Sequence, residues 1–150
     1  MLKIYSIGFT KKNAKTFFES LINNQVKKII DVRLNNTSQL AGFAKGNDLK
    51  YFLGKIAGMG YEYEVIFAPT KVILDAYKKG DIDWMQYEEK YIQLMKERKI
   101  SEYIEKKGID FWESACLLCS EETPDNCHRR LAINEIIKVF PTTDVHHIIK

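Results

Sequence analysis

Residues 28–33 read KIIDVR, an apolar run that closes on one acidic and one basic side chain. A short, continuous run of branched apolar residues is typical of a strand buried on both faces of a parallel sheet. Residues 3–7, KIYSI, form a similar run closed by Gly8. Between the two runs, apolar residues recur at helical spacing over residues 14–22, and Thr10 is a suitable cap for that helix. The first thirty residues therefore predict a strand, a helix and a second strand.

The rest of the sequence continues this alternation of strands and helices. Further strands are predicted at residues 62–66, 111–119 and 144–149, where apolar and β-branched side chains gather. Helices are predicted after Asn47 or Asp48, from Thr70 to Lys79, after Asp83, and over residues 131–140. Because strands that alternate with helices form mostly parallel sheets, we expect a three-layer α/β fold. Helices would cover both faces of a Rossmann-like, doubly wound, mostly parallel sheet.

Length and composition are those of a single globular domain. Of the 150 residues, 45% are apolar and 29% are charged, and no linker-like segment divides the chain, so we expect one domain over residues 1–150. No apolar run approaches the ~20 residues of a membrane-spanning helix, and residues 1–5 have the pattern of a strand rather than of a signal peptide. Three cysteines are too few for a disulfide framework. These features predict a cytoplasmic protein without a membrane partner.

Polar residues gather at the carboxyl ends of the predicted strands, where open parallel sheets bind their ligands. The candidate catalytic residues carry a carboxylate or a thiol, and they are Asp31, Cys119, Glu121 and Cys127. The candidate ligand-binding residues are small, hydroxyl-bearing or basic, and they are Gly8, Thr10, Arg33, Ser38, His128 and Arg129. Three of the four arginines lie in segments that reach this rim, and guanidinium groups bind phosphate and carboxylate in a planar, two-pronged fashion. The pattern therefore predicts an anion site.

The segment Cys127-His128-Arg129 is expected at the start of a helix. Backbone N–H groups and the helix dipole favour an anion at that position, and the same field lowers the pKa of a cysteine. The segment has two interpretations. It either faces a ligand, or it is structural, with Cys127 as a small buried thiol beside solvated basic side chains. Asp31 and Arg33 carry two similar interpretations, a ligand-binding pair or a structural ion pair.

Zinc is an alternative to an anion, because Cys116, Cys119, Cys127 and His128 are all ligands that zinc accepts. Residues three apart on a strand point to opposite faces, which argues against a shared site for Cys116 and Cys119. Adjacent residues such as Cys127 and His128 also rarely bind one tetrahedral ion together. We therefore expect no metal here, and the sequence identifies no cofactor.

A set of short motifs gives the chain a family resemblance: SIGFT at residues 6–10, DVR at 31–33, Ser38, GF at 42–43, GYEY at 60–63, LLCSE at 117–121, and CHR at 127–129. On these motifs the chain resembles the domain of unknown function 488 family. The resemblance spans most of the chain and implies an α/β fold with no assigned activity and with the shared polar positions as its site. Two positions depart from the family pattern, because Phe9 replaces a common His or Tyr and Asn36-Thr37 replaces a loop proline. Phe9 can neither donate a hydrogen bond nor take a proton.

The favoured function is the binding of a small molecule that bears a phosphate or a carboxylate, such as a nucleotide. In an enzyme, Glu121 or Asp31 would act as acid or base, and Cys119 or Cys127 would act as nucleophile. One alternative is a nucleic-acid-binding module, because the pI is about 8.6 and tyrosines are interleaved with lysines. Another is a redox or regulatory protein that uses Cys119 and Cys127.

Overall fold

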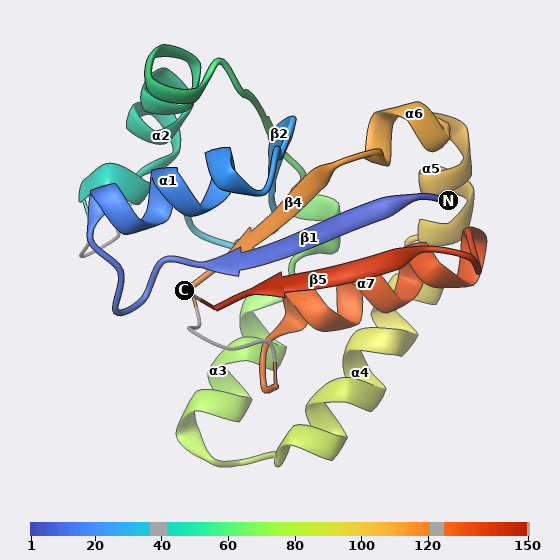
Figure 1. Ribbon diagram of the computed structural model, residues 1–150. Helices are drawn as coiled ribbons and strands as arrows, with labels where there is room; N and C mark the ends of the chain where they lie inside the picture. The colour runs from blue at the N-terminus through green and yellow to red at the C-terminus, as the bar shows by residue number, and fades with distance from the viewer. Residues whose placement is uncertain (37–41, 121–124, 150) are drawn as a thin grey trace.

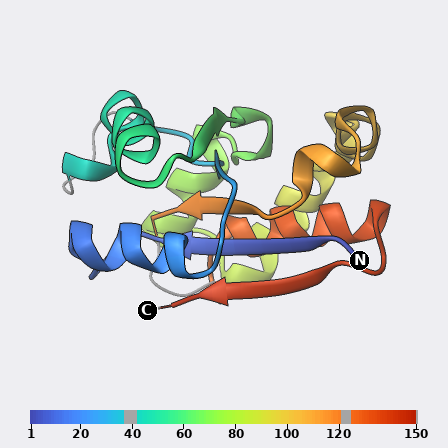
Figure 2. The ribbon, with the colours of Figure 1, turned by 45° about the horizontal axis from the view of Figure 1, so that its top comes forward.

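In the part of the chain that the structure describes, the strands form one five-stranded parallel sheet. The structure is a computed structural model, and it describes residues 1–36, 42–120 and 125–149. The strands are β1 (Lys3–Gly8), β2 (Lys28–Asp31), β3 (Gly60–Tyr63), β4 (Ala115–Cys119) and β5 (Asp144–Ile148), in the spatial order β3-β2-β4-β1-β5. Figures 1 and 2 show helices on both faces of this sheet. The predicted three-layer α/β fold is confirmed.

The helices divide into two groups, one on each face. One face carries α1 (Ala14–Asn23), α2 (Gly46–Phe52), the short turn η1 (Gly42–Ala44) and the π-helical turn η2 (Leu53–Ala57). The other face carries α3 (Lys71–Lys79), α4 (Trp84–Glu97), α5 (Ile100–Lys107), α6 (Ile109–Trp112), α7 (His128–Val139) and the turn η3 (Val65–Phe67). Within the described residues, every helix is too short or too polar to cross a lipid bilayer.

Side chains of β4 alternate between two separate apolar cores. Cys116 and Leu118 pack with the helices of the α1 face, whereas Leu117 and Cys119 pack with the helices of the α7 face. This alternation follows from the period of two in a strand. The expectation that Cys116 and Cys119 point to opposite faces is therefore confirmed.

Two helices begin at the residues that the sequence predicts. The side chain of Thr70 accepts a hydrogen bond from the backbone N–H of Ile73 at the start of α3. At the start of α4, Asp83 and Gln86 exchange side-chain and backbone hydrogen bonds in a capping box. Both caps satisfy N–H groups that have no partner inside the helix.

Two other helix starts differ from the prediction. Helix α1 is capped by Asn13, whose Oδ1 accepts a hydrogen bond of 2.8 Å from the N–H of Thr16. The predicted cap, Thr10, lies one turn earlier and hydrogen-bonds elsewhere. Helix α2 begins at Gly46, ahead of the predicted cap positions at residues 47–48. These differences leave the identity of both helices unchanged.

The boundaries of two strands also differ from the prediction. Strand β3 covers residues 60–63 rather than 62–66, because the chain turns into η3 directly afterwards. Strand β4 begins at Ala115, and the aromatic pair Phe111 and Trp112 belongs to α6. Trp112 is fully buried, and its Nε1 donates to the carbonyl of Ile104 in α5 at 3.0 Å. The aromatic residues therefore pack against a helix and do not extend the strand.

The segments that follow the neighbouring strands β2 and β4 lie on opposite faces of the sheet. After β2 the chain continues to α2 on one face, and after β4 it continues to α7 on the other. A change of direction of this kind leaves a crevice beyond the carboxyl ends of the two strands. The topology therefore singles out the ends of β2 and β4 as the place for a ligand.

Candidate functional site

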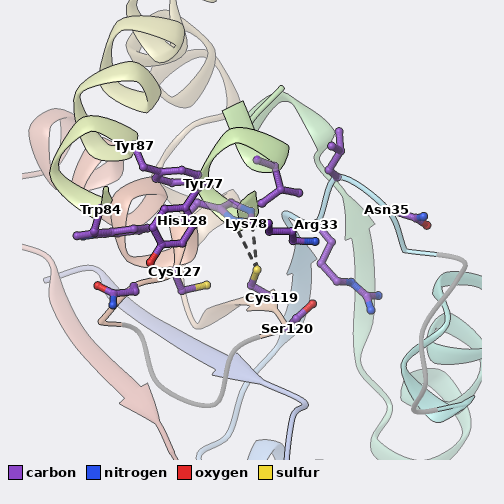
Figure 3. Close-up of a pocket in the computed structure, with 13 residues that line it drawn as sticks. Arg33, Asn35, Tyr77, Lys78, Trp84, Tyr87, Cys119, Ser120, Cys127 and His128 are labelled. Carbon is purple, nitrogen blue, oxygen red and sulfur yellow. Dashed lines mark hydrogen bonds between the residues drawn. The ribbon is translucent and has the colours of Figure 1, made fainter. Parts of the chain in front are cut away.

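A pocket of about 370 Å³ lies at this switch point (Figure 3). That volume falls in the range of small-molecule sites. Its lining comes from the ends of β2 and β4, from α3 and α4, and from the start of α7. The lining residues are Arg33, Leu34, Asn35, Leu74, Tyr77, Lys78, Trp84, Tyr87, Cys119, Ser120, Asn126, Cys127 and His128.

Aromatic rings from α3 and α4 form one wall of the pocket. The rings of Trp84 and Tyr87 are stacked, with centroids 4.8 Å apart and 16° between their planes. Tyr77 meets Tyr87 at 5.2 Å between centroids. Burial raises the pKa of Tyr87, so its phenol stays neutral at physiological pH. The wall is suited to a flat, uncharged group.

Polar and cationic groups share the pocket with this wall. Lys78 stands on α3 as an exposed cation, and Ser120 follows β4. Helix α7 begins at the pocket, and Cys127 at its N-cap forms no side-chain capping bond. Arg33 is 2% exposed, and among the described residues its Nη1 finds no hydrogen-bond partner. The start of a helix, the exposed cation of Lys78 and the buried Nη1 group of Arg33 favour an anion in this pocket.

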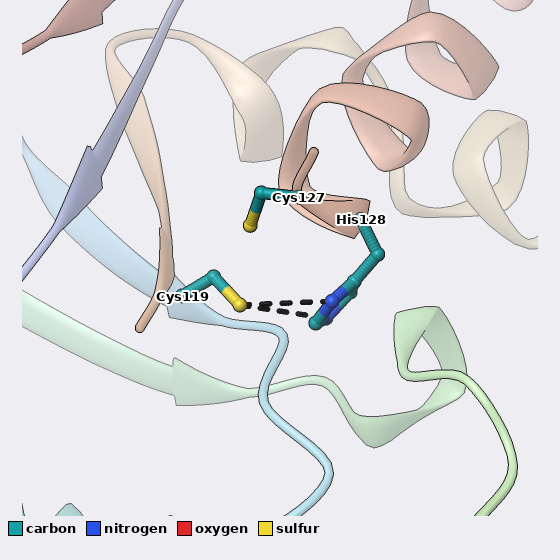
Figure 4. Close-up of side chains that lie close together, drawn as sticks. All are labelled: Cys119, Cys127 and His128. Atoms are coloured by element: carbon teal, nitrogen blue, oxygen red, sulfur yellow. Dashed lines mark hydrogen bonds between the residues drawn. The ribbon is translucent and has the colours of Figure 1, made fainter. Parts of the chain in front are cut away.

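Cys119, Cys127 and His128 form a buried cluster on the α7 side of the pocket (Figure 4). One potential ligand atom from each residue lies within 4.8 Å of the other two. The Cys119 Sγ is 3.6 Å from His128 Nδ1 and 3.9 Å from Nε2, and Nε2 lies 2.6 Å from the carbonyl oxygen of Val32. A carbonyl only accepts, so the Nε2 that faces it carries a proton.

The two thiols of the cluster titrate in opposite directions. A hydrogen bond from the Cys127 thiol, the backbone N–H of Ser120 and the charge of Arg129 lower the pKa of Cys119, although burial opposes this shift. The pKa of Cys127 is raised, because its thiol donates to Cys119 and because it is buried. Cys116, on the other face of the sheet, has its pKa raised by burial. The sulfur atom that accumulates negative charge is therefore that of Cys119.

Asp31, at the end of β2, is the centre of a buried hydrogen-bond network. Its carboxylate accepts bonds of 2.8 Å from Nε and from Nη2 of Arg33, and one of 2.5 Å from the hydroxyl of Tyr61. Asn36 in turn donates to the Tyr61 hydroxyl at 3.0 Å. Burial alone would lower the pKa of Arg33, but the pairing with Asp31 outweighs it and raises that pKa. The pair has the geometry of a structural ion pair, in which Arg33 lines the pocket and Asp31 does not.

Arg129 is buried in α7 and contacts a lining residue without lining the pocket itself. Its Nε donates to Ser6 Oγ at 3.1 Å, and Nη1 donates to Cys127 Sγ at 3.7 Å. Since Ser6 Oγ accepts from Arg129, its hydroxyl hydrogen is available for Nδ1 of His147 at 2.6 Å. Arg129 therefore ties the cysteine cluster to β1 and β5.

The structure brings together some of the residues that the sequence singles out and separates others. Arg33, Cys119, Cys127 and His128 line the pocket. Gly8 pairs with Cys119 in the sheet, and Thr10 Oγ1 donates to the Ser120 carbonyl at 2.5 Å, so both contact the carboxyl end of β4 or the residue directly after it. Asp31 and Arg129 contact lining residues without being lining residues themselves. Ser38 and Glu121 lie outside the described residues.

The aromatic wall and Lys78 were not identified as site residues from the sequence. Trp84 and Tyr87 fit an apolar helical stripe, which predicts core packing. The available signal was their position at the start of α4, next to Tyr77 and Lys78 at the end of α3.

Comparison with known proteins gives a family and nothing closer. The family model described as Domain of unknown function DUF488 matches residues 13–136, which is most of the chain. No curated protein and no solved structure matches the chain significantly. The matched range contains the whole pocket lining, including the cysteine cluster and the aromatic wall. The chain therefore belongs to the DUF488 family of domains of unknown function.

Proposed function

We propose that this protein binds a small anionic molecule with a flat ring, of the mononucleotide class, in the pocket at the ends of β2 and β4. The observation that carries the proposal is the pairing of a stacked aromatic wall with cationic groups in one pocket of about 370 Å³. A base would stack on the half-buried ring of Trp84, whose other face is covered by the buried Tyr87, and a phosphate or carboxylate would lie near Lys78 and the start of α7. The pocket therefore offers an aromatic surface for the ring of such a ligand and a cationic surface for its anionic group.

The size of the pocket supports a small molecule over a nucleic-acid strand. Proteins that bind single strands use a groove that follows several nucleotides and offers one aromatic platform after another. In this chain the stacked pair, Trp84 with Tyr87, and the cation of Lys78 converge on one hollow. A single ring with one anionic group is the better fit.

The test measures binding of adenosine monophosphate, adenosine and ribose 5-phosphate by calorimetry and by tryptophan fluorescence. The chain has two tryptophans; Trp84 lines the pocket, whereas Trp112 is fully buried elsewhere. Quenching by the nucleotide should therefore report on Trp84. The nucleotide should bind more tightly than either fragment, since each fragment uses one half of the site.

Lys78→Ala should weaken nucleotide binding roughly fivefold, which corresponds to about 1 kcal/mol for an exposed charge contact. Lys79→Ala is the matched control, because Lys79 is also exposed at the end of α3 and is not a lining residue. Trp84→Leu should cost about 1–3 kcal/mol by calorimetry, the usual value of one stacked base. Absence of binding across the panel, or equal losses in the two lysine variants, would disprove the proposal.

A further inference from the structure

We propose that Cys119, Cys127 and His128 bind one Zn²⁺ ion through Cys119 Sγ, Cys127 Sγ and His128 Nδ1. The three atoms lie within 4.8 Å of one another. In a tetrahedral site with Zn–S near 2.3 Å and Zn–N near 2.0–2.1 Å, a sulfur and a nitrogen ligand are about 3.6 Å apart. The observed separation of Cys119 Sγ and His128 Nδ1 is 3.6 Å. This pair already has the tetrahedral separation, and the other two pairs are no farther apart than 4.8 Å.

The orientation of His128 is that of a metal ligand. Zinc-bound histidines donate their second ring N–H to a carbonyl or carboxylate, which fixes the tautomer and aims the lone pair. Here Nε2 faces the Val32 carbonyl at 2.6 Å, and Nδ1 faces the sulfur of Cys119. His128 is 7% exposed, so the carbonyl rather than solvent sets this tautomer. The hydrogen bond to Val32 is therefore the supporting contact that a bound ion requires.

The backbone explains how two adjacent residues can serve one ion. Cys127 is extended, with φ −135° and ψ 136°, and His128 is the first residue of α7. The chain changes direction between them, so their side chains are not held on opposite sides as they would be within a strand. Figure 4 shows both side chains directed toward Cys119.

The surroundings of the sulfurs suit thiolates bound to zinc. Arg129 Nη1 donates to Cys127 Sγ at 3.7 Å, and the N–H of Ser120 donates to Cys119. Both cysteines are at least nine-tenths buried, with exposed fractions of 6% and 3%. Donors of this kind offset the negative charge that two thiolates bring to the ion.

Among the residues that the structure describes, three protein ligands meet here, which leaves the fourth zinc position for a small molecule. Cys119, Cys127 and His128 all line the pocket, and Cys116 is on the far face of the sheet and cannot complete the set. Open three-ligand sites, including Cys₂His sites, are typical of catalytic zinc, whereas structural zinc has four protein ligands. The open position would hold a water molecule or an oxygen of a bound anion. This inference goes beyond the proposed nucleotide binding and does not depend on it.

The first measurement is zinc stoichiometry by mass spectrometry of metals, on protein prepared with a non-chelating reductant so that the thiols stay reduced. One zinc per chain is expected. Cys119→Ala, Cys127→Ala and His128→Ala should each weaken zinc binding by at least about 100-fold, measured by competition with a chromogenic chelator. Loss of a contact that only supports a ligand costs up to about 100-fold, and loss of the ligand itself should cost at least as much. Cys116→Ala is the matched control, since Cys116 lies on the same strand and is equally buried but faces the other core. It should retain the wild-type affinity.

Cobalt substitution of the wild-type chain keeps the test decisive even if a ligand variant fails to fold. Co²⁺ bound by two thiolates and an imidazole should show thiolate-to-metal charge transfer and the strong visible bands of tetrahedral geometry. Zinc far below one per chain, or an octahedral cobalt spectrum without charge transfer, would overturn the inference. So would an equal loss of affinity in Cys116→Ala. Nucleotide titrations of the zinc-loaded and zinc-free chains separate this result from that for the proposed function.

Discussion

Substituting Asp31 by Asn tests the buried ion pair that supports the pocket. Asp31 is 0% exposed and Arg33 is 2% exposed, and the two side chains share hydrogen bonds of 2.8 Å. The substitution leaves the Arg33 guanidinium buried beside a neutral amide. Breaking a buried pair from one side costs about 3–5 kcal/mol, because the remaining charge stays desolvated. In a chain of this size that loss lowers the melting temperature by roughly 6–20 °C.

Urea unfolding followed by far-UV circular dichroism measures the loss directly. Asp75→Asn is the matched control, since its partner Lys71 is 2.6 Å away but the two side chains are 81% and 38% exposed. Solvent screens that pair, so the control should keep the wild-type midpoint. Adding Arg33→Met to Asp31→Asn should recover stability by removing the uncompensated charge. The reasoning is refuted if Asp31→Asn is as mild as the control, or if Arg33→Met adds a further loss.

Two further substitutions test individual hydrogen bonds. Tyr91→Phe removes the hydroxyl that donates to the buried carbonyl of Phe67 at 2.8 Å. The free energy of unfolding, measured in urea, should fall by about 1–3 kcal/mol, because the carbonyl loses its partner. Tyr51→Phe is the control, since that ring is mostly exposed, and it should leave the free energy of unfolding unchanged. His147 has its pKa lowered below 6.5, chiefly by burial, so the unfolded chain binds more protons and folding stability should fall as the pH drops through 6.5. His147→Asn should flatten that dependence in thermal melts from pH 8 to pH 5; an unchanged slope would contradict the assignment.

The sequence predicts the fold well where burial alone dictates the pattern. Strands β2 and β4 are buried on both faces, so their apolar runs are unambiguous. Strand β3 lies at the sheet edge and is half-buried to exposed, and its boundary was misplaced because no apolar run marks it. Phe111 and Trp112 have high β propensity, but packing against α5 draws them into α6.

The candidate site is predictable in location but only partly in composition. The carboxyl ends of the strands follow from topology, which brings Arg33 and Cys119 to one edge. Helical periodicity identifies the inward side of α4, and Trp84 does pack against the core there, but periodicity does not tell that the same side chain also borders a hollow. Likewise, the change of backbone direction between Cys127 and His128 cannot be read from the sequence.

The division of the helices between the two faces has a practical consequence. In the described part of the chain, α1 and α2 contribute no side chain to the pocket lining, because the lining comes from strand ends and from α3, α4 and α7. Lys15 and Glu19 are exposed on α1, on the far side of the sheet from the cysteine cluster. A fluorophore or a surface-coupling group attached there would leave the mouth of the pocket unobstructed. The fold thus offers a handle for immobilising the protein while ligands are screened.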